Sequence, residues 1–400
     1  MTIHRGAQSA WRVPFVRPDL PAYDTIEPVF RQIHASGILT KGVELSSLET
    51  EAAGLLGVDQ VVAVSSCSVG LALVLRALRA EQAATVGAPR TEVIVPSFIF
   101  LAAPAAIEWA GLTPVFVDVD PANWTIDVAV AVAAIGPRTL AVLGCHTFGC
   151  PCDTAALEAA CDAAGVAFLV DAAHGLGCLR RGRQVGCEGL AQVFSLSPTK
   201  LVCAGEGGLV ATDSRPLADS LRSLREYGND GHYDCIVPGL NGRLAELPAA
   251  LGRASLVRLP EVAARRAAVA AAYTRGLAGL PGLSLQAIDG RDTSSWKDYS
   301  ILIDSHRFGA DRDEVRLGLA AVGVDTRTYY DPPCHAMPAF SRHRPDWPLP
   351  VTDRLAAGSV SLPMGAHLNE DLAAEIAAVI ASTCRGMDGS RHAASAVKGG

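Results

Sequence analysis

Short apolar runs alternate with longer helical patterns between residues 60 and 213. Seven runs rich in valine, leucine and alanine fit buried strands: Val61–Ser65, Glu92–Phe98, Pro114–Val119, Leu140–Cys145, Ala167–Asp171, Gln192–Leu196 and Gly208–Thr212. Amphipathic patterns lie between the early runs, for example Leu71–Gln82 and Thr154–Ala164. Continuous apolar strands that alternate with helices are typical of a mostly parallel sheet covered on both faces. The pattern therefore predicts an α/β protein with a large, doubly wound, seven-stranded sheet.

The last two predicted strands are joined by a loop that runs only from Leu196 to Gly208. Parallel neighbours need a crossover, usually a helix, and this loop has no helical pattern. We therefore expect the last strand to run antiparallel to its neighbour.

From Leu217 onward the pattern becomes mainly helical, with a long segment rich in Ala, Arg and Leu between Leu244 and Leu280. Apolar runs resume at residues 298–304 and 360–362, followed by a helical pattern at 370–380. This predicts a second, smaller α+β domain. We expect a large domain over residues 13–255, a small domain over 256–385, and loose ends at 1–12 and 386–400.

The composition is that of a large globular protein. Half of the 400 residues are hydrophobic and the mean hydropathy is +0.26. No apolar run reaches the roughly 18 residues that a membrane helix needs, and Met1 to Val13 lack the apolar core of a secretory signal. The net charge of −7 comes from interspersed acidic and basic residues, which indicates no nucleic-acid surface. We expect a cytoplasmic protein.

The eleven cysteines are odd in number and irregularly spaced. We therefore expect most of them to be small buried apolar residues in a reducing compartment, without a disulfide framework. The sequence Cys150-Pro151-Cys152 has one residue between its thiols, not the two of common zinc or redox pairs, so we expect no metal site.

Lysine is rare in this chain, with Lys41, Lys200, Lys297 and Lys398 among 34 basic residues. Lys41 has the context of a loop, Lys297 of a polar stretch and Lys398 of a tail. Only Lys200 follows an apolar strand and precedes a glycine-rich turn, Ala204-Gly205-Glu206-Gly207-Gly208. A partly desolvated lysine there suits imine chemistry with a carbonyl or pyridoxal group. The alternative is an ordinary surface lysine.

Polar residues follow the first predicted strand as Ser65-Ser66-Cys67-Ser68, directly before a helix. Backbone N–H groups at the start of a helix, together with a hydroxyl, form a seat for a phosphate. Simple N-capping by Ser66 or Ser68 is the alternative.

Another strand ends in Asp171-Ala172-Ala173-His174. A buried carboxylate needs a partner, and the N–H of a pyridinium ring is one. Asp171 could also be a helix cap or a metal ligand, and His174 fits either a cofactor contact or the core. Phe100 could stack on a flat ring, and Ser195 could offer a second hydroxyl to the phosphate. Together, these strand ends point to pyridoxal phosphate.

The chain resembles a known family, the DegT/DnrJ/StrS aminotransferases, over about residues 18–380. The matching stretches are Ser36 to Gly42, Glu92 to Ser97, Pro114 to Asp118, His146 to Gly149, Asp171 to His174, Ser195 to Gly208, Gly239 to Arg243, and Ser361 to Met364. The resemblance implies the fold of aspartate aminotransferase, called fold type I, and pyridoxal 5′-phosphate as the cofactor.

The resemblance also implies roles for single residues. Lys200 matches the lysine that forms the imine and shuttles the proton, and Asp171 the partner of the pyridine nitrogen. The remaining cofactor-binding positions are His174 near the cofactor hydroxyl, Ser68 and Ser195 at the phosphate, Cys67 through its backbone N–H, Phe100 over the ring, and Asn241 at the phosphate of a neighbouring subunit. Asn241 therefore implies a homodimer with shared sites.

Two departures from the family pattern stand out. The phosphate loop usually reads Asn-Gly-Thr, and here it is Ser66-Cys67-Ser68. We expect the side chain of Cys67 to narrow an approach that glycine would leave open. Ile99 stands where the family often has threonine, on the substrate side.

The implied activity is transamination of a nucleotide-linked ketosugar with an amino-acid donor such as glutamate. The form Gly205-Glu206-Gly207-Gly208 resembles that of enzymes acting at C4 of the sugar, which favours a dTDP-4-keto-6-deoxyhexose. Arg243 and other arginines are candidates for the diphosphate. A 3-ketosugar and a cyclitol ketone are the alternative acceptors, and the alternative of another class is a non-enzymatic, cofactor-binding regulator.

Overall fold

The computed structural model describes residues 11–83, 89–229, 231–232 and 234–385. Its largest sheet has seven strands in the order β1-β9-β8-β5-β4-β2-β3. The strands are β1 (Gln60–Val64), β2 (Glu92–Pro96), β3 (Thr113–Val117), β4 (Thr139–Cys145), β5 (Ala167–Asp171), β8 (Ala191–Ser195) and β9 (Gly208–Thr212). All neighbours are parallel except that β9 runs antiparallel to both β1 and β8. Both the seven strands and the reversed last strand are confirmed.

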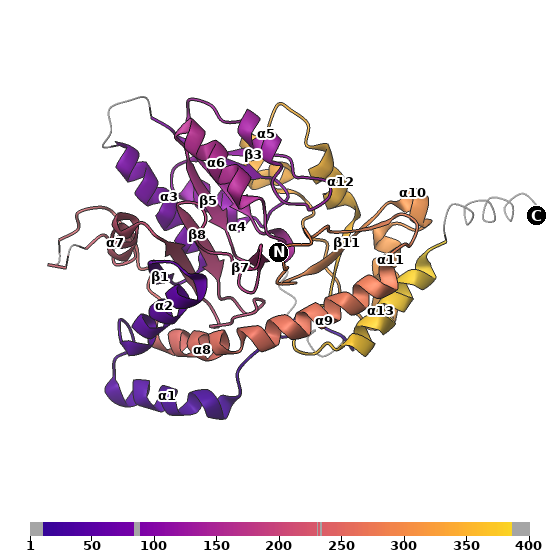
Figure 1. Cartoon of the computed structure of the whole chain (residues 1–400), viewed down its shortest axis with the longest axis horizontal. Coiled ribbons are helices and arrows are strands. Elements are labelled where there is room, and N and C mark those ends of the chain that lie inside the picture. Colours follow the sequence, from indigo (N-terminus) through magenta and orange to yellow (C-terminus); the bar gives the residue numbers. More distant parts are fainter. Residues whose placement is uncertain (1–10, 84–88, 230, 233, 386–400) are drawn as a thin grey trace, which may run out of the picture.

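Helices cover both faces of this sheet (Figure 1). One face packs against α2 (Val43–Leu56), α5 (Val128–Ala133), α6 (Thr154–Ala164) and α8 (Glu246–Val257). The other face packs against α3 (Cys67–Ala83), α4 (Ala102–Trp109) and α7 (Arg215–Leu224). The doubly wound architecture is therefore confirmed. Helix α1 (Tyr23–Ser36) lies outside these layers against α8, and a small hairpin of β6 (Leu179–Arg180) and β7 (Arg183–Gln184) follows β5.

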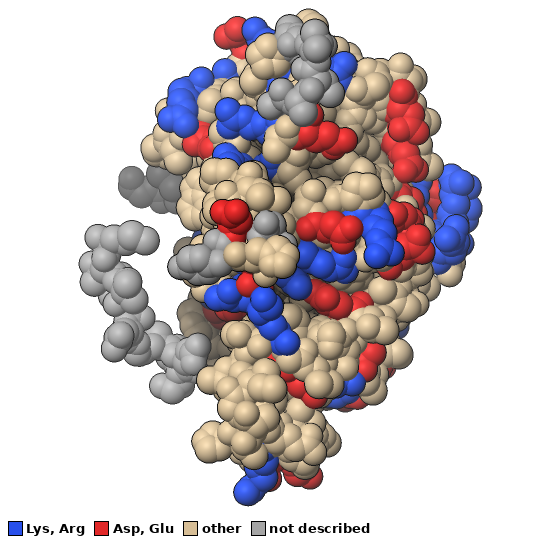
Figure 2. Space-filling view, turned by 90° about the vertical axis from the view of Figure 1, so that its left-hand side faces the viewer, with Lys and Arg blue, Asp and Glu red and all other residues tan. Residues whose placement is uncertain are grey.

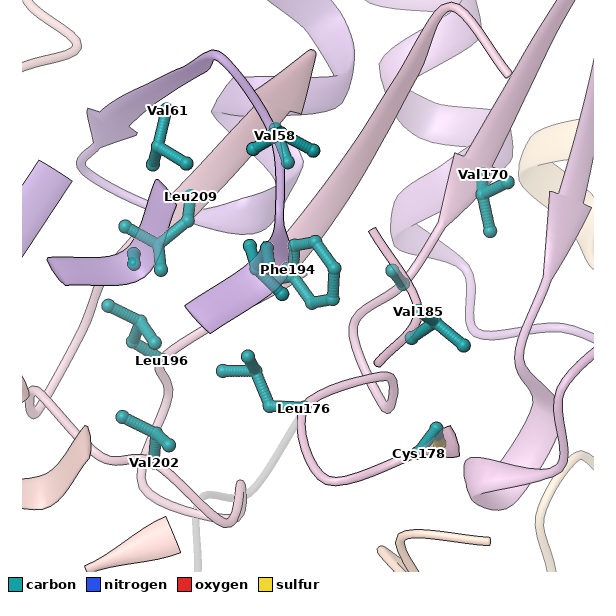
Figure 3. Close-up of a cluster of buried hydrophobic side chains, with 14 of the residues drawn as sticks. Val58, Val61, Val170, Leu176, Cys178, Val185, Phe194, Leu196, Val202 and Leu209 are labelled. Atoms are coloured by element: carbon teal, nitrogen blue, oxygen red, sulfur yellow. The ribbon is translucent and has the colours of Figure 1, made fainter. Parts of the chain in front are cut away.

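Strand β8 shows how alternating side chains fill both layers. Phe194 and Leu196 point into the cluster under α2 and α8, where Figure 3 shows them with Leu209 and Val61. Val193 points to the opposite face, toward α3. There α3 approaches the sheet closely, because a Cβ on Gly70 would lie 2.7 Å from Val193. This contact holds the first turn of α3 at the carboxyl ends of the strands.

A second, three-stranded antiparallel sheet has its own core. Its strands are β10 (Leu283–Leu285), β11 (Tyr299–Ile303) and β12 (Ser359–Leu362), in that order. The helices of this region are α9 (Leu259–Leu277), α10 (Ser305–Phe308), α11 (Arg312–Ala321), α12 (Pro350–Gly358) and α13 (Glu370–Thr383). Helices α9 and α13 run side by side along it (Figure 1). Short 3₁₀ turns lie at η1 (Thr147–Gly149), η2 (Cys334–Ala336) and η3 (Pro338–His343).

The predicted helical segment from Leu244 to Leu280 is two helices. Helix α8 ends at Val257 and α9 begins at Leu259, with Pro260 in its first turn. Proline has no N–H to donate and is tolerated where a helix starts.

The division into domains stays a prediction. Its boundary between residues 255 and 256 falls inside the last turn of α8. At the amino end, Val13 is buried in the core of the smaller sheet and pairs with Val324. Residues 1–10 and 386–400, expected as loose ends, lie outside the described residues.

Asp118, directly after β3, joins the two sheets. Its carboxylate accepts hydrogen bonds from the backbone N–H groups of Val351 and Thr352 and from the hydroxyl of Thr352, at 2.7 to 2.9 Å. A carboxylate at the start of a helix satisfies N–H groups that have no partner inside the helix. Asp118 thereby fixes the first turn of α12 to the large sheet.

All eleven cysteines are free thiols and eight of them are buried, as the sequence predicts for most of them. In the described ranges, no helix is both long enough and apolar enough to cross a membrane. Basic and acidic side chains are interspersed on the face shown in Figure 2.

Candidate active site

A cavity of about 350 Å³ lies beyond the carboxyl ends of the large sheet, where open α/β sheets bind their ligands. Seven of the eight predicted site residues line it: Cys67, Ser68, Phe100, Asp171, His174, Ser195 and Lys200. Larger hollows of about 670 and 510 Å³ lie beside β10 and α7, but neither is lined by a lysine or histidine. The chemistry is therefore concentrated in the smaller cavity.

The first turn of α3 provides an anion seat. Ser66 caps the helix, since its hydroxyl accepts the N–H of Val69 at 3.2 Å. Ser68 is exposed and Ser195 lines the same cavity from the end of β8. The capping interpretation is therefore confirmed for Ser66. Ser68 lines the cavity, so anion binding by its hydroxyl stays a prediction.

Gly208 permits this arrangement. A Cβ at this position would lie 2.6 Å from the backbone nitrogen of Cys67 and 2.7 Å from the carbonyl carbon of Ser66. Both atoms belong to backbone, which cannot move aside as a flexible side chain can. The glycine-rich turn after Lys200 therefore lets β9 lie directly against the anion seat.

The side chain of Cys67 is directed below this seat. Its Sγ lies 3.9 Å from Oδ1 of Asp171 and 3.5 Å from the carbonyl oxygen of Val193. Burial, followed by the charge of Asp171, raises the pKa of the Cys67 thiol well above its usual value. The protonated thiol occupies the space between α3 and the sheet. We expected this side chain to narrow the space through which a phosphate approaches the helix. The structure differs, because the sulfur is turned toward Asp171.

Asp171 is buried at the end of β5 and faces the cavity. Its Oδ1 accepts the N–H of Ala173 at 3.0 Å, whereas Oδ2 accepts no hydrogen bond from the described residues. Burial raises the pKa of Asp171, and Lys200 opposes that rise. A carboxylate with one oxygen free can accept a hydrogen bond from a bound N–H group.

His174 presents a neutral imidazole to the cavity. Burial, and then the charge of Lys200, lowers the pKa of His174 well below its usual value. Its Nδ1 accepts the backbone N–H of Phe148 at 3.1 Å. A neutral ring that accepts through Nδ1 carries its proton on Nε2. His174 can therefore donate a hydrogen bond from Nε2.

Lys200 lies in the turn after β8. Burial and the nearby ammonium group of Lys297 lower the pKa of Lys200 from 10.5 to about 8. At pH 7, about one lysine in ten with this pKa is uncharged, against fewer than about one in a thousand at the ordinary value. An uncharged amine is the form that attacks a carbonyl group.

Lys297 and Asp298 line the same cavity, which the sequence did not indicate. Although Lys297 lies in a polar stretch of the sequence, Lys297 is only 5% exposed and Asp298 only 3% exposed. The Nζ atom of Lys297 lies 2.6 and 2.7 Å from the two carboxylate oxygens of Asp298. The feature of the sequence that could have indicated these two residues is their position directly before the apolar run that forms β11.

Apolar and aromatic side chains complete the wall. Phe100 is half exposed, and Ile99 is buried beside it. The residues that sequence reasoning missed here are Phe15, Val16, Cys145, Tyr329 and Tyr330. Several of these come from segments distant in the sequence, so no local motif marks them.

Asn241 is the one predicted residue that does not line the cavity. It is exposed and pairs with Glu226. Its neighbour Arg243 also lies outside the cavity lining and is bound to Glu226, with a nitrogen to oxygen distance of 2.8 Å. The next residue, Gly242, accepts the N–H of Ser65 through its carbonyl oxygen at 2.8 Å. Asn241 is therefore adjacent in sequence to a contact with the end of β1.

The residues of the cavity fit pyridoxal phosphate. The start of α3 and two hydroxyl groups suit the phosphate, and the free oxygen of Asp171 suits a pyridinium N–H. The Nε2–H of His174 suits a ring oxygen, and Lys200 suits the aldehyde. Each of these groups faces one cavity.

Comparison with known proteins agrees with this chemistry. The model of the DegT/DnrJ/EryC1/StrS aminotransferase family matches residues 23–381. The chain is 37% identical over 372 residues to dTDP-3-amino-3,4,6-trideoxy-alpha-D-glucose transaminase of Streptomyces venezuelae, covering 91% of this chain and 94% of that protein. It is 36% identical to UDP-N-acetyl-3-dehydro-alpha-D-glucosamine 3-aminotransferase of Acidithiobacillus ferrooxidans, covering 85% and 88%.

Solved structures show the same similarity. The structure of DesI in the presence of its TDP-sugar product has a TM-score of 0.86 and 37% identity, covering 96% of this chain and 97% of that chain. DesV of S. venezuelae, in complex with a ketimine intermediate, has a TM-score of 0.83 and 34% identity, covering 92% and 98%. The family match spans nearly the whole chain, and the fold places a lysine and a buried carboxylate in one cavity. The chain therefore belongs to the DegT/DnrJ/EryC1/StrS aminotransferase family and is a pyridoxal-phosphate-dependent transaminase.

Proposed function

We propose that this transaminase transfers an amino group from an amino acid such as glutamate to a nucleotide-linked ketosugar, and that the acceptor is a dTDP-4-keto-6-deoxyhexose. Two relatives are named for nucleotide sugars, and DesI was solved in the presence of its TDP-sugar product, which supports the substrate class. The observation that carries the choice of C4 is Glu206, which lines the cavity with Lys200 and belongs to the Gly-Glu-Gly-Gly form associated with that position.

The cofactor-binding roles follow from the contacts of each residue. Ser68, Ser195 and the backbone N–H of Cys67 would hold the phosphate, and Phe100 would cover one face of the ring. When bound, pyridoxal phosphate supplies a carbonyl carbon that takes up amino groups and a ring that accepts an electron pair. Asp171 would hold the proton on the ring nitrogen through Oδ2, and His174 would donate Nε2–H to the ring oxygen.

Lys200 is the residue that moves protons. Its uncharged amine takes the proton from the α-carbon of the amino donor, and its ammonium form later returns a proton. A pKa of about 8 keeps both forms accessible near neutral pH. The aromatic and aliphatic wall limits water around this amine.

The same wall suits a deoxysugar. Ile99 and Phe100 lie on one side of the cavity lining, and Tyr329 and Tyr330 come from the smaller sheet's region. A methyl group at C6 has no hydrogen-bonding needs and gains from apolar contact, whereas a hydroxymethyl group there would lose hydrogen bonds to water.

Amination at C3 is the second candidate. Two relatives carry names that specify a 3-amino or 3-dehydro sugar, at 37% and 36% identity.

We also propose a homodimer as the active unit, in which Asn241 reaches the cofactor phosphate of the neighbouring subunit. The exposure of Asn241 and its absence from the cavity of its own chain support that placement.

The test is to load the protein with the amino form of the cofactor and offer the 4-keto and 3-keto isomers of the nucleotide-linked sugar side by side. NMR of the product identifies the aminated carbon. We expect the 4-amino sugar. Exclusive 3-amino product, or preference for a free cyclitol ketone, would overturn the choice of acceptor. A protein whose cofactor spectrum does not respond to glutamate or any other amino donor would favour the non-enzymatic regulator.

A further inference from the structure

We infer that Lys297 and Asp298 are positioning residues for Lys200: their buried ion pair holds two fixed charges in the wall of the cavity that Lys200 also lines. The inference rests on the transaminase activity of the chain and is independent of which sugar is the acceptor. It gives a role to two residues of the smaller sheet's region, which also contributes Tyr329 and Tyr330 to the cavity wall.

The pair is buried within the cavity wall. Lys297 and Asp298 line the cavity together with Lys200, at 5% and 3% exposure, and the two contacts of Nζ are 2.6 and 2.7 Å. Removing two charges from water is costly, and well-packed apolar residues of similar volume often give equal or greater stability. Stability alone therefore gives no reason for an ion pair at this place, whereas an effect on a neighbouring amine does.

The backbone around the pair is held in place. Arg266 donates from Nη1 to the carbonyl oxygens of Lys297 and Trp296, at 3.0 and 3.2 Å. The N–H of Asp298 donates to the carbonyl oxygen of Phe148 at 3.3 Å, and β11 begins at the next residue. The two charges are therefore fixed in space, and charges that do not reorganise act most strongly on a nearby group.

Lys200 is the amine that lines the same cavity as these charges. Burial is the main cause of its lowered pKa, and the charge of Lys297 is the next. The charges of Asp298, Cys67 and Asp171 act in the opposite direction. Further titratable groups that line the cavity from other elements are Cys145, His174, Glu206, Tyr329 and Tyr330. His174 is neutral, so Lys297 is the cation in the wall with a direct effect on Lys200.

Single replacements of Lys297 and Asp298 should shift the pKa of Lys200 in opposite directions. Lys297→Met removes the cation and leaves the carboxylate of Asp298, so the ammonium form of Lys200 becomes more favourable. Asp298→Asn leaves the cation without its partner, so the uncharged amine becomes more favourable. The double variant removes both charges and should return toward the wild type. A role in packing alone would not give two shifts of opposite sign.

The experiment measures the reactivity of each lysine in the cofactor-free full-length protein as a function of pH. An amine-reactive reagent labels only uncharged amines, and mass spectrometry of peptides assigns each label, because the chain has only four lysines. We expect the midpoint of Lys200 near pH 8 in the wild type. It should rise by about one pH unit in Lys297→Met and fall in Asp298→Asn. At pH 7, labelling of Lys200 in Lys297→Met should therefore be about tenfold slower.

Two further variants serve as controls. Lys297→Arg keeps the positive charge and should keep the wild-type midpoint. Arg275→Met removes an exposed cation that pairs with Glu370 outside the cavity, and should leave Lys200 unchanged. Circular dichroism establishes that each variant is folded. In Asp298→Asn the labelling of Lys297 is recorded as well, and the reactivity of Lys200 is compared below the midpoint of Lys297, where that residue is still a cation.

Identical midpoints in the wild type and both single variants would overturn the inference, as would shifts of the same sign. If Lys297→Met does not fold, Lys297→Gln takes its place, because it removes the charge and keeps a polar side chain, and it should raise the midpoint of Lys200 in the same way. The labelling needs no sugar substrate. A negative result for this inference is thus distinguishable from a wrong choice of sugar acceptor, which only the product analysis tests.

Discussion

The thiol of Cys67 lies 3.9 Å from Oδ1 of Asp171, directly beneath the first turn of α3. The helix that provides the anion seat therefore also contacts the carboxylate proposed to hold the cofactor ring. The second oxygen of that carboxylate is left for a ligand, because Oδ1 already receives the N–H of Ala173.

Replacing Asp171 with asparagine should leave the fold intact and slow turnover on the order of 100- to 1,000-fold, because an amide cannot stabilise a protonated ring nitrogen. Turnover and the cofactor spectrum are the measurements. Asp127→Asn is the matched control, since Asp127 caps α5 and asparagine caps equally well. If both variants kept near-normal rates, Asp171 would be no more than an anchor for Ala173.

Replacing Lys200 with arginine should abolish the spectral signature of the covalently held cofactor and reduce turnover by at least about 100- to 10,000-fold. Arginine keeps the charge but does not give up its proton and forms no imine. Absorbance and single-turnover kinetics test this. Lys41→Arg, at an exposed position paired with Glu226, should behave as the wild type. Full activity of the Lys200 variant would refute the assignment of this residue.

Replacing Gly208 with alanine should weaken cofactor binding by about tenfold or more. The new Cβ would lie 2.6 Å from the nitrogen of Cys67 and displace the seat of the phosphate, and each 1.4 kcal/mol of lost binding is about a factor of ten. Fluorescence titration of the cofactor-free protein measures the affinity. Gly54→Ala, where the structure has open space around the new atom, is the control. Equal affinities for the two variants would show that β9 does not support the seat.

Mixing an Asn241→Ala variant with a Lys200→Arg variant should restore part of the activity if Asn241 acts across a dimer interface. In the mixed dimer one site receives both defects and the other receives neither. Activity is measured after the subunits have been exchanged, with native mass spectrometry to confirm mixed dimers. Mixed dimers without any rescue would show that each subunit builds its own site.

Stability should fall as the pH decreases below about 6.5, in part because of His146. Burial lowers the pKa of His146 from 6.5 to about 4, so between these values the unfolded chain takes up a proton that the folded chain does not. This contributes a loss of up to about 1.4 kcal/mol per pH unit over that window. Urea unfolding at several pH values measures it. His146→Asn should lose this share of the slope, whereas exposed His34→Asn should not.

Much of the large sheet is predictable because its strands are continuous apolar runs. Ala167–Asp171 and Gly208–Thr212 agree with the structure at both ends, and Thr154–Ala164 agrees for a helix. The reversed β9 followed from the length of the preceding loop. The break at Arg258 was missed, since the Ala- and Arg-rich pattern continues across it and only Pro260 marks it.

The site was predictable where each residue follows a strand of the large sheet, since such strands share one edge. Lys200, Asp171 and Ser195 are of this kind. Lys297 and Tyr330 are not, because they reach the cavity only when the smaller sheet packs beside the larger one. Such contacts depend on long-range packing, and no spacing within the sequence records them. The orientation of the Cys67 thiol depends on the same packing.

Asp118 determines whether α12 is able to separate from the large sheet. Drawing α12 away from β3 would strip a buried carboxylate of the donors from Val351 and Thr352, at a cost of several kcal/mol. We therefore expect α12 to stay with the large sheet, and substrates to enter past Phe100 and Glu206, which are exposed residues of the cavity lining. One aspartate, remote from the reacting atoms, would thus keep α12 fixed against the large sheet while substrates enter and leave.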